Sequence, residues 1–191
     1  MIAFLLAGSG SAAEDWSPAK TVEGILIESR PTESGFDVHR GTTTVCTDIE
    51  SLERFVADTS RFQEWIPYTR SAKLLDRTAV DFVYYVRTTT PWPFKDRDMI
   101  YRISRQEADD ESLRLIVTGQ PDYQPLADNA ERIQAATGEW YLIPAAGGIT
   151  VSYELYVHPG AVPRSLANRR LATAVGLTLA NLAAAFPCKP A

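Results

Sequence analysis

The clearest pattern in the chain is an alternation of apolar and polar residues, which is typical of strands with one buried face. In the last such segment the apolar positions are Ile149, Val151, Tyr153, Leu155 and Val157. The runs Phe82–Val86 and Leu113–Val117 repeat the alternation. Because successive side chains of a strand point to opposite faces, we predict an antiparallel meander from Arg70 to Val157 with one apolar and one solvated face.

A segment near the C-terminus is long enough to cover that apolar face. Pro163–Phe186 is rich in Ala and Leu, and its charged residues, Arg164, Arg169 and Arg170, all lie near its start. Proline suits the first turn of a helix, whereas Pro187 cannot continue one. At about 1.5 Å per residue, such a helix would be roughly 36 Å long. We therefore predict a long helix over Pro163–Phe186 that packs against the sheet.

The first part of the chain predicts a hairpin followed by two short helices. Val22–Arg30 and Phe36–Cys46 are rich in β-branched residues and are separated by a cluster of turn residues. Thr47-Asp48-Ile49-Glu50 fits a capping box with Thr47 as the N-cap. Ser60-Arg61-Phe62-Gln63 repeats that pattern, and Pro67 ends the second helix. We expect Phe62, Trp65 and Ile66 to face the sheet.

Two prolines divide the predicted meander. Pro91 and Pro93 cannot both lie within a sheet, because proline has no N–H group for the strand ladder. They indicate a stiff crossing between strands Ala79–Thr90 and Asp98–Gln106. Tyr123–Gln134 shows no clear period, and we predict a loop there.

Taken in order, these pieces resemble the START domain, the StAR-related lipid transfer family. The resemblance rests on the crossing Pro91–Asp98, the strand Gly138–Pro144, the turn His158-Pro159-Gly160 and the final helix. It extends from Trp16 to Phe186, so we take residues 16–187 as one START-like domain. It implies an α+β helix-grip fold, in which a curved antiparallel sheet surrounds a long C-terminal helix and encloses an apolar cavity.

The family resemblance implies non-enzymatic binding and transfer of a lipid or other hydrophobic small molecule. The alternative is a polyketide cyclase or aromatase-like enzyme that uses the same cavity, and a third hypothesis is an interaction protein with a filled core. His39 and His158 are the only histidines, and no GxSxG, HExxH or glycine-rich phosphate motif occurs. We therefore assign no catalytic residue and expect no enzyme, no cofactor and no metal site.

We expect the cavity to be lined by inward-facing strand residues and by the apolar face of the final helix. These residues are Phe82, Tyr84, Val86, Met99, Tyr101, Ile103, Leu113, Leu115, Val117, Trp140, Leu142, Val151, Tyr153, Leu155, Leu171, Val175 and Leu179. Arg97 and Asp98 are expected to be structural, with the arginine fork bonding a carboxylate or carbonyl groups. Sterol-binding relatives have a charged pair in the cavity. Tyr84 and Ile103 occupy the matching stretches here, so the resemblance does not imply sterol specificity.

Composition agrees with one globular domain and narrows the partners. The chain has 191 residues, of which 45% are hydrophobic and 23% charged. Its net charge of -5 argues against a nucleic-acid partner. No run approaches the roughly 20 apolar residues of a membrane span. We expect a hydrophobic small molecule as partner, with transient membrane contact.

Residues 1–13 predict a truncated signal peptide. The apolar stretch Ile2–Ala7 is followed by the small residues Ser11-Ala12-Ala13, which fits export to the periplasm or beyond. A cytoplasmic protein with an unstructured start is the alternative. Cys46 and Cys188 are the only cysteines and lack a metal-binding spacing. We favour a free, buried Cys46 on a strand, with a Cys46–Cys188 disulfide as the alternative for an exported protein.

Overall fold

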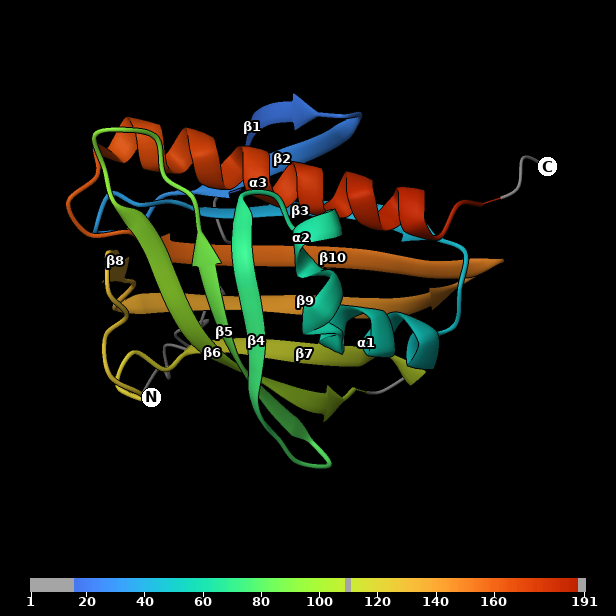
Figure 1. Cartoon of the computed structure of the whole chain (residues 1–191). Coiled ribbons are helices and arrows are strands. Elements are labelled where there is room, and N and C mark those ends of the chain that lie inside the picture. Colours follow the sequence, from blue (N-terminus) through green and yellow to red (C-terminus); the bar gives the residue numbers. More distant parts are fainter. Residues whose placement is uncertain (1–15, 109–110, 189–191) are drawn as a thin grey trace, which may run out of the picture.

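The computed structural model describes residues 16–108 and 111–188, and the predicted signal segment 1–13 lies outside them. Within these residues a ten-stranded curved sheet holds a long helix against its concave side (Figure 1). The strands are β1 (Ser17–Val22), β2 (Ile25–Arg30), β3 (Val38–Val45), β4 (Thr69–Arg77), β5 (Asp81–Thr88), β6 (Asp96–Glu107), β7 (Leu113–Gly119), β8 (Ala130–Arg132), β9 (Ala135–Ala145) and β10 (Gly148–His158). The helices are α1 (Ile49–Ala57), the 3-10 turn η1 (Thr59–Arg61), α2 (Phe62–Trp65) and α3 (Arg164–Ala185).

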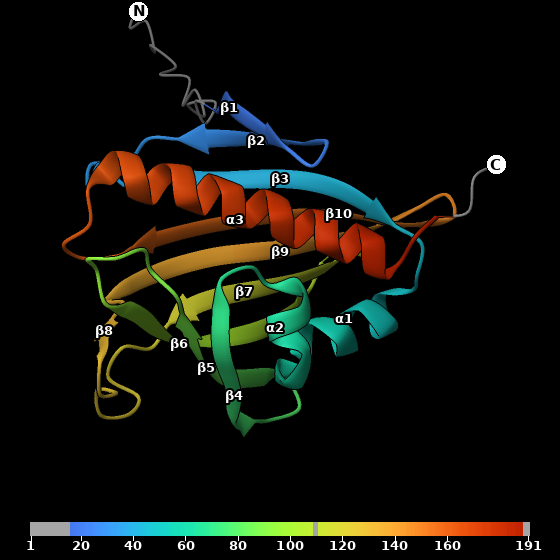
Figure 2. The ribbon, with the colours of Figure 1, turned by 45° about the horizontal axis from the view of Figure 1, so that its top comes forward.

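The order of the strands confirms the predicted meander and the helix-grip fold. The sheet runs β1-β2-β3-β10-β9-β7-β6-β5-β4, and neighbours along this path are antiparallel. The segment β3–α1–α2–β4 crosses from the middle of the sheet to its far edge, which places α1 and α2 over one end of the concave face (Figure 2). The interior therefore has one end covered by these two helices.

The start of the chain differs from the prediction in its turns and caps. Val22–Arg30 is broken at Glu23 and Gly24, both with positive φ (46° and 80°), so β1 and β2 form a hairpin of their own. Such a turn needs the left-handed region that glycine adopts without strain. The expected hairpin of β2 with β3 is present.

Aspartates cap the helix α1 and the 3-10 turn η1. Asp48, and not Thr47, caps α1, because its carboxylate accepts a hydrogen bond from the Ser51 N–H at 2.7 Å. Asp58, and not Ser60, caps η1, which continues directly into α2. A carboxylate at the N-cap satisfies an N–H group that has no partner within the helix and suits the positive end of the helix dipole.

The segment predicted as a loop, Tyr123–Gln134, contains the short strand β8. It pairs in parallel with β6, and it is fixed by a buried ion pair between Arg132 and Asp98. The Arg132 Nε and Nη2 atoms donate to the two Asp98 carboxylate oxygens, each at 3.0 Å, and the same guanidinium donates to the carbonyls of Pro121, Gln124 and Pro125. A strand of three residues is too short to show an alternation of apolar and polar residues. Its position is instead specified by the Arg132 side chain.

The long helix α3 matches the predicted range to within a residue at each end. Its middle lies close to the first strands: a Cβ atom at Gly176 would lie 2.5 Å from the Cβ atom of Val22, so only glycine fits this contact. None of the helices in the described ranges is long and apolar enough to cross a membrane.

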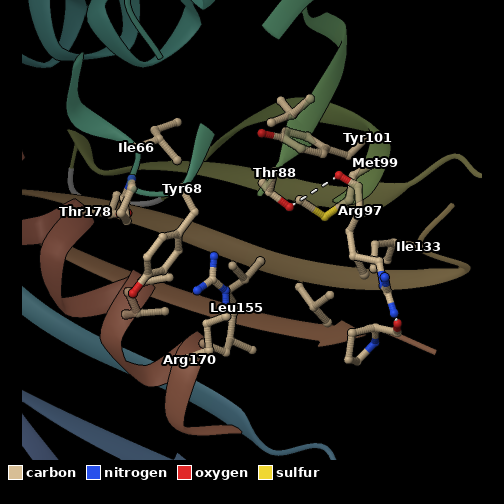
Figure 3. Close-up of a pocket in the computed structure, with 18 of the residues that line it drawn as sticks. Ile66, Tyr68, Thr88, Arg97, Met99, Tyr101, Ile133, Leu155, Arg170 and Thr178 are labelled. Carbon is tan, nitrogen blue, oxygen red and sulfur yellow. Dashed lines mark hydrogen bonds between the residues drawn. The ribbon is translucent and has the colours of Figure 1, made fainter. Parts of the chain in front are cut away.

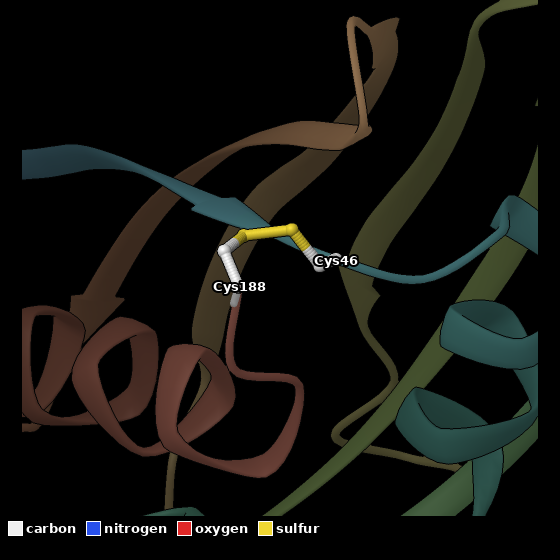
Figure 4. The surroundings of a disulfide bond; sticks show 2 residues. All are labelled: Cys46 and Cys188. Atoms are coloured by element: carbon white, nitrogen blue, oxygen red, sulfur yellow. A yellow bond between two sulfur atoms is a disulfide. The ribbon is translucent and has the colours of Figure 1, made fainter. Parts of the chain in front are cut away.

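The C-terminal end of α3 is fastened to β3 by a disulfide. Cys46 follows β3 directly and pairs with Cys188, with their Cα atoms 4.9 Å apart (Figure 4). The Cys46 N–H also donates to the Phe186 carbonyl at 3.1 Å. Our preference for a free Cys46 was therefore wrong, because the chain beyond α3 turns back to the end of β3, a tertiary contact that no local pattern encodes.

The end of the interior beneath α1 and α2 is filled. Phe62 and Trp65 of α2 are buried as expected, and the Trp65 ring packs against Phe55 at 5.1 Å and Trp140 at 6.0 Å between ring centroids. The Asn181 side chain of α3 donates to the Trp65 carbonyl at 2.9 Å. Helix α2 thus forms a solid floor, and the space that remains lies toward the N-terminal end of α3.

Candidate ligand-binding site

A cavity of about 180 Å³ lies between the concave face of the sheet and the N-terminal half of α3 (Figure 3). A single water molecule needs roughly 10–15 Å³ of such space, so this volume is far larger than a packing defect. Strands β5, β6, β7, β9 and β10 form its walls, and two segments close it toward α3: residues 66–68, and residues 88–91, which begin at the last residue of β5.

Most of the residues expected to line the cavity do so. The sheet and α3 bring together Tyr84, Val86, Met99, Tyr101, Ile103, Val117, Trp140, Tyr153, Leu155, Leu171 and Val175. The other expected residues are absent from the lining and lie in packed structure: Phe82, Leu113, Leu115, Leu142, Val151 and Leu179. They point inward as the alternation requires, but α1, α2 and the C-terminal half of α3 pack on that part of the sheet. The alternation along a strand predicts which side chains face the interior. It does not predict which part of the interior is a cavity and which part is packed.

Sequence reasoning missed the lining residues that come from connecting segments. Pro67 and Tyr68 precede β4, Thr89 and Pro91 follow β5, and Val162 precedes α3. These segments have no hydrophobic period. The prolines that punctuate them were the only available signal, and they indicated chain crossings rather than cavity walls.

The hydroxyl groups in the cavity fall into two classes. The Tyr84 hydroxyl donates to the Val56 carbonyl at 3.2 Å and the Thr88 hydroxyl to the Arg97 carbonyl at 3.3 Å, so both have partners. Among the described lining residues, the hydroxyls of Tyr101 and Tyr153 have no hydrogen-bond partner, and the same holds for those of Tyr68, Thr90 and Thr178. Burial raises the pKa of the Tyr101 and Tyr153 phenols well above the ordinary value. They therefore remain protonated and can donate a hydrogen bond to a ligand.

Tyr153 is held in place by its neighbours. Its ring stacks on Trp140, which lies opposite it in the β9–β10 pair, with centroids 3.8 Å apart. Tyr101 meets Tyr84 edge to face at 5.2 Å. Aromatic pairs of these kinds each contribute about 0.5–1.5 kcal/mol beyond area burial, so the hydroxyls of Tyr101 and Tyr153 are presented by a rigid wall.

Arg97 reaches the cavity, but protein groups already surround its guanidinium. Its Nε atom donates to the Pro159 carbonyl at 2.9 Å and its Nη1 atom to the Lys95 carbonyl at 2.6 Å. Its Nη2 atom lies 2.8 Å from a carboxylate oxygen of Glu131. These contacts connect β6 to the segment before α3 and to β8, which is the fastening role expected of this arginine fork.

Arg170 of α3 is the second arginine of the lining. Its Nη2 atom donates to the Thr89 carbonyl at 2.6 Å, and its guanidinium carbon lies 3.5 Å from the centroid of the Tyr68 ring. Burial lowers the pKa of this guanidinium. Arg170 thus joins α3 to the two segments that close the cavity.

Groups suited to acid–base or metal chemistry do not gather here. In residues 16–108 and 111–188, no cluster of His, Cys, Asp or Glu could hold a metal ion, and the described lining contains none of these residue types. His158 accepts a hydrogen bond from the Gly160 N–H at 3.3 Å, which makes it a turn residue. His39 is buried in β3, outside the cavity lining.

Comparison with profiles of known protein families finds no match. Among curated proteins, the chain is 29% identical over 185 residues to an uncharacterized Pseudomonas aeruginosa protein, covering 95% of this chain and 91% of that one. Among solved structures, a STAR-related lipid transfer protein fragment from Xanthomonas axonopodis is 32% identical with a TM-score of 0.81, covering 89% of this chain and 97% of that one.

More distant structures share the fold. Human StAR-related lipid transfer protein 5 has a TM-score of 0.76 at 15% identity, covering 93% of this chain and 88% of that one. The Zhui aromatase/cyclase from Streptomyces has a TM-score of 0.53 at 12% identity, covering 78% and 92%. The identity of 32% to the Xanthomonas fragment, over 97% of that fragment, decides the assignment: the chain belongs to the StAR-related lipid transfer (START) family.

Proposed function

We propose that this protein binds a lipid or other hydrophobic small molecule in the cavity beneath α3 and carries it without chemical change. The observation that supports the proposal is the cavity itself, a mostly apolar space with a few polar groups inside an otherwise packed domain. Concave apolar sites with few polar groups are the usual form of small-molecule sites. The Xanthomonas relative, named as a lipid transfer protein, supports the same class of ligand.

The polar groups fit recognition better than catalysis. A cyclase needs positioned acids, bases or oxyanion donors. The free hydroxyls of Tyr101 and Tyr153 have pKa values raised by burial, so at neutral pH they donate hydrogen bonds and do not remove protons. A ligand carbonyl or hydroxyl that accepts from them would be oriented, while the apolar walls provide the affinity.

The fastening of α3 favours entry at its N-terminal end. The disulfide and the Cys46–Phe186 hydrogen bond hold the C-terminal end. At the other end, α3 and the segment before it are held by non-covalent contacts, such as the hydrogen bonds of Arg170 to Thr89 and of Arg97 to Pro159, and the helix follows the turn at Gly160, whose φ is 74°. Because a sheet opens only by breaking ladder hydrogen bonds, we propose that the cavity opens by movement of the first turns of α3 and of the segment before it.

A membrane contact is proposed at the same end. Trp92 is 92% exposed and stands between Pro91 and Pro93, directly beside the segment 88–91 that closes the cavity. Tryptophan favours the interface between water and lipid. We also propose export from the cytoplasm, which the Cys46–Cys188 disulfide supports because such bonds persist in oxidising compartments.

A cavity-filling variant with a matched control tests the proposal. Ala174 of α3 lines the cavity, whereas Ala184 lies exposed near the end of the same helix. Titration with fluorescent phospholipids and fatty acids should show saturable one-to-one binding by the natural protein and by Ala184→Trp. Ala174→Trp should bind none of them while keeping the circular dichroism spectrum of the fold. Undiminished binding by a folded Ala174→Trp protein would place the ligand elsewhere.

A further inference from the structure

Arg170 places a positively charged side chain in the lining of the cavity, and its role as a ligand contact rests on the proposed function. We propose that the natural ligand is an amphipathic anion, whose carboxylate or phosphate binds the Arg170 guanidinium while its hydrocarbon part fills the cavity. Arg170 is then a specificity-determining residue that separates charged lipids from their neutral counterparts.

Most of the hydrogen-bond donors of Arg170 are unused within the described residues. A guanidinium carries five N–H groups in a fixed fork. Within the described part of the chain, Arg170 makes one hydrogen bond, from Nη2 to the Thr89 carbonyl. The Nε and Nη1 groups have no protein acceptor there. A carboxylate or phosphate accepts two parallel N–H bonds from such a fork, which is the arrangement that arginine favours over lysine.

The Arg170 guanidinium also has no carboxylate counter-charge within the described residues. No ion pair involving Arg170 occurs among residues 16–108 and 111–188, and the described lining contains no carboxylate. Arg97 provides the contrast, because Glu131 and two carbonyls already surround its guanidinium. Burial disfavours the charged form of Arg170, as its lowered pKa shows. Since arginine stays protonated in proteins, an anionic ligand would offset this cost.

The segments 66–68 and 88–91 form rigid surroundings for Arg170. The Tyr68 ring lies against the guanidinium, and Tyr68 has a φ of 66°, a left-handed conformation that is rare for a bulky residue. The Tyr68 carbonyl accepts from the Thr89 N–H at 2.9 Å. The segments 66–68 and 88–91 are thereby tied together beneath the arginine. Strained backbone of this kind is concentrated at binding sites.

The polar groups then lie at two places in the cavity. Arg170 of α3 lies against the two segments that close the cavity, and Tyr101 and Tyr153 lie on strands β6 and β10. Figure 3 shows Arg170 and Tyr101 in the lining. A ligand with its charged end at Arg170 can place a chain among the apolar strand residues and a second acceptor, such as a carbonyl or hydroxyl, at the tyrosines. The charge stays near the route of entry and the tail is buried.

A competing explanation is that Arg170 only fastens α3 to the Thr89 carbonyl. If Arg170 only holds α3 in place, its substitution should change the affinities for charged and neutral ligands equally, because it would alter the cavity and not a contact with either ligand. An anion site predicts a loss confined to the charged ligand. The two explanations are therefore separated by comparing a lipid acid with its own methyl ester.

The test measures fluorescence titrations of cis-parinaric acid and its methyl ester with the natural protein, Arg170→Met and Arg169→Met. Arg169 is the control, because it is the neighbouring, exposed arginine and lies outside the lining. Displacement of the bound probe by lysophosphatidic acid measures the affinity for a phosphate lipid, and displacement by monoolein measures the affinity for a neutral one. Charge-assisted hydrogen bonds are about twice as strong as neutral ones, so we expect the acid to bind at least about tenfold more tightly than its ester.

Arg170→Met should weaken the charged probe about tenfold and change its neutral counterpart less than twofold, whereas Arg169→Met should change neither. Whether parinaric acid or lysophosphatidic acid loses more affinity identifies a carboxylate or a phosphate as the natural group. Equal affinity for charged and neutral probes in the natural protein would overturn the inference and leave the proposed function standing. Equal losses for both in Arg170→Met would also overturn it. No binding of any probe would refute the proposed function.

Discussion

Removal of the Cys46–Cys188 disulfide is expected to destabilise the protein strongly. The two cysteines are 142 residues apart, so the bond closes a loop that includes most of the domain. In the chain-entropy description, a loop of this length gives a stabilisation of about 5 kcal/mol at 25 °C. Native disulfides generally contribute about 2–5 kcal/mol, since the unfolded chain is not a random coil. We expect the Cys46→Ser/Cys188→Ser variant to lose an amount in this range.

The loss should be uneven across the molecule. Without the bond, the end of α3 keeps the hydrogen bond from the Cys46 position to the Phe186 carbonyl and the contact of the Phe186 and Phe55 rings at 5.1 Å. These contacts are weaker than a covalent bond, so the last turns of α3 should exchange amide hydrogens faster. The β5, β6 and β9 walls should keep their protection.

Guanidinium chloride unfolding, followed by tryptophan fluorescence, measures the change in the free energy of unfolding. The natural protein is compared in its oxidised form, after reduction, and as the double serine variant. The reduced protein and the variant should unfold at similarly lower denaturant concentrations. Thiol counting on the oxidised protein is the control. Two free thiols, or a change below about 1 kcal/mol on reduction, would refute this account of how α3 is anchored.

Three further predictions concern a pH response, an ion pair and the membrane. Burial lowers the pKa of His39, with nearby Asp37 opposing the effect, so its contribution to stability is complete above about pH 6.5 and is lost as pH falls below that value. Each unit of lowering corresponds to about 1.4 kcal/mol, and His39→Gln should flatten the fall in unfolding free energy between pH 7 and 5. Arg132→Met leaves the Asp98 carboxylate buried and unpaired and should cost about 3–5 kcal/mol in denaturant unfolding; a loss under about 1 kcal/mol would contradict the bonding described. Trp92→Ala should weaken sedimentation with lipid vesicles and leave thermal stability unchanged, and equal vesicle binding would place the membrane contact elsewhere.

Local sequence features were sufficient to predict the meander, from the alternation of apolar residues, and the final helix, from an Ala- and Leu-rich run bounded by prolines. The alternation from Ile149 to Val157 became β10, and the Ala- and Leu-rich run from Pro163 became α3. Features that depend on tertiary contact were missed or, like the disulfide, given only as the less favoured alternative. The pairing of Cys46 with Cys188 and the strand β8, fixed by Arg132, bring together residues that no local pattern relates.

The candidate site was predictable only in part, for a similar reason. The alternation of apolar and polar residues correctly predicted that Tyr101, Tyr153 and Leu115 face the interior. The packing of α1 and α2 then decides that Leu115 is in solid core while the two tyrosines face the cavity. The sequence placed Arg170 only among the three charged residues near the start of the final helix, because its position beside Tyr68 depends on how three distant segments meet.

Native mass spectrometry of the protein purified from its own host shows directly whether the cavity holds a lipid. We predict a one-to-one complex with a hydrophobic molecule, retained by Ala184→Trp and absent from Ala174→Trp. Fragmentation of the complex would give the mass of the ligand and show whether it carries a carboxylate or phosphate. A natural protein that appears only as the bare polypeptide, and that takes up no lipid on incubation with extracts of host membranes, would contradict the claim that this cavity is a lipid site.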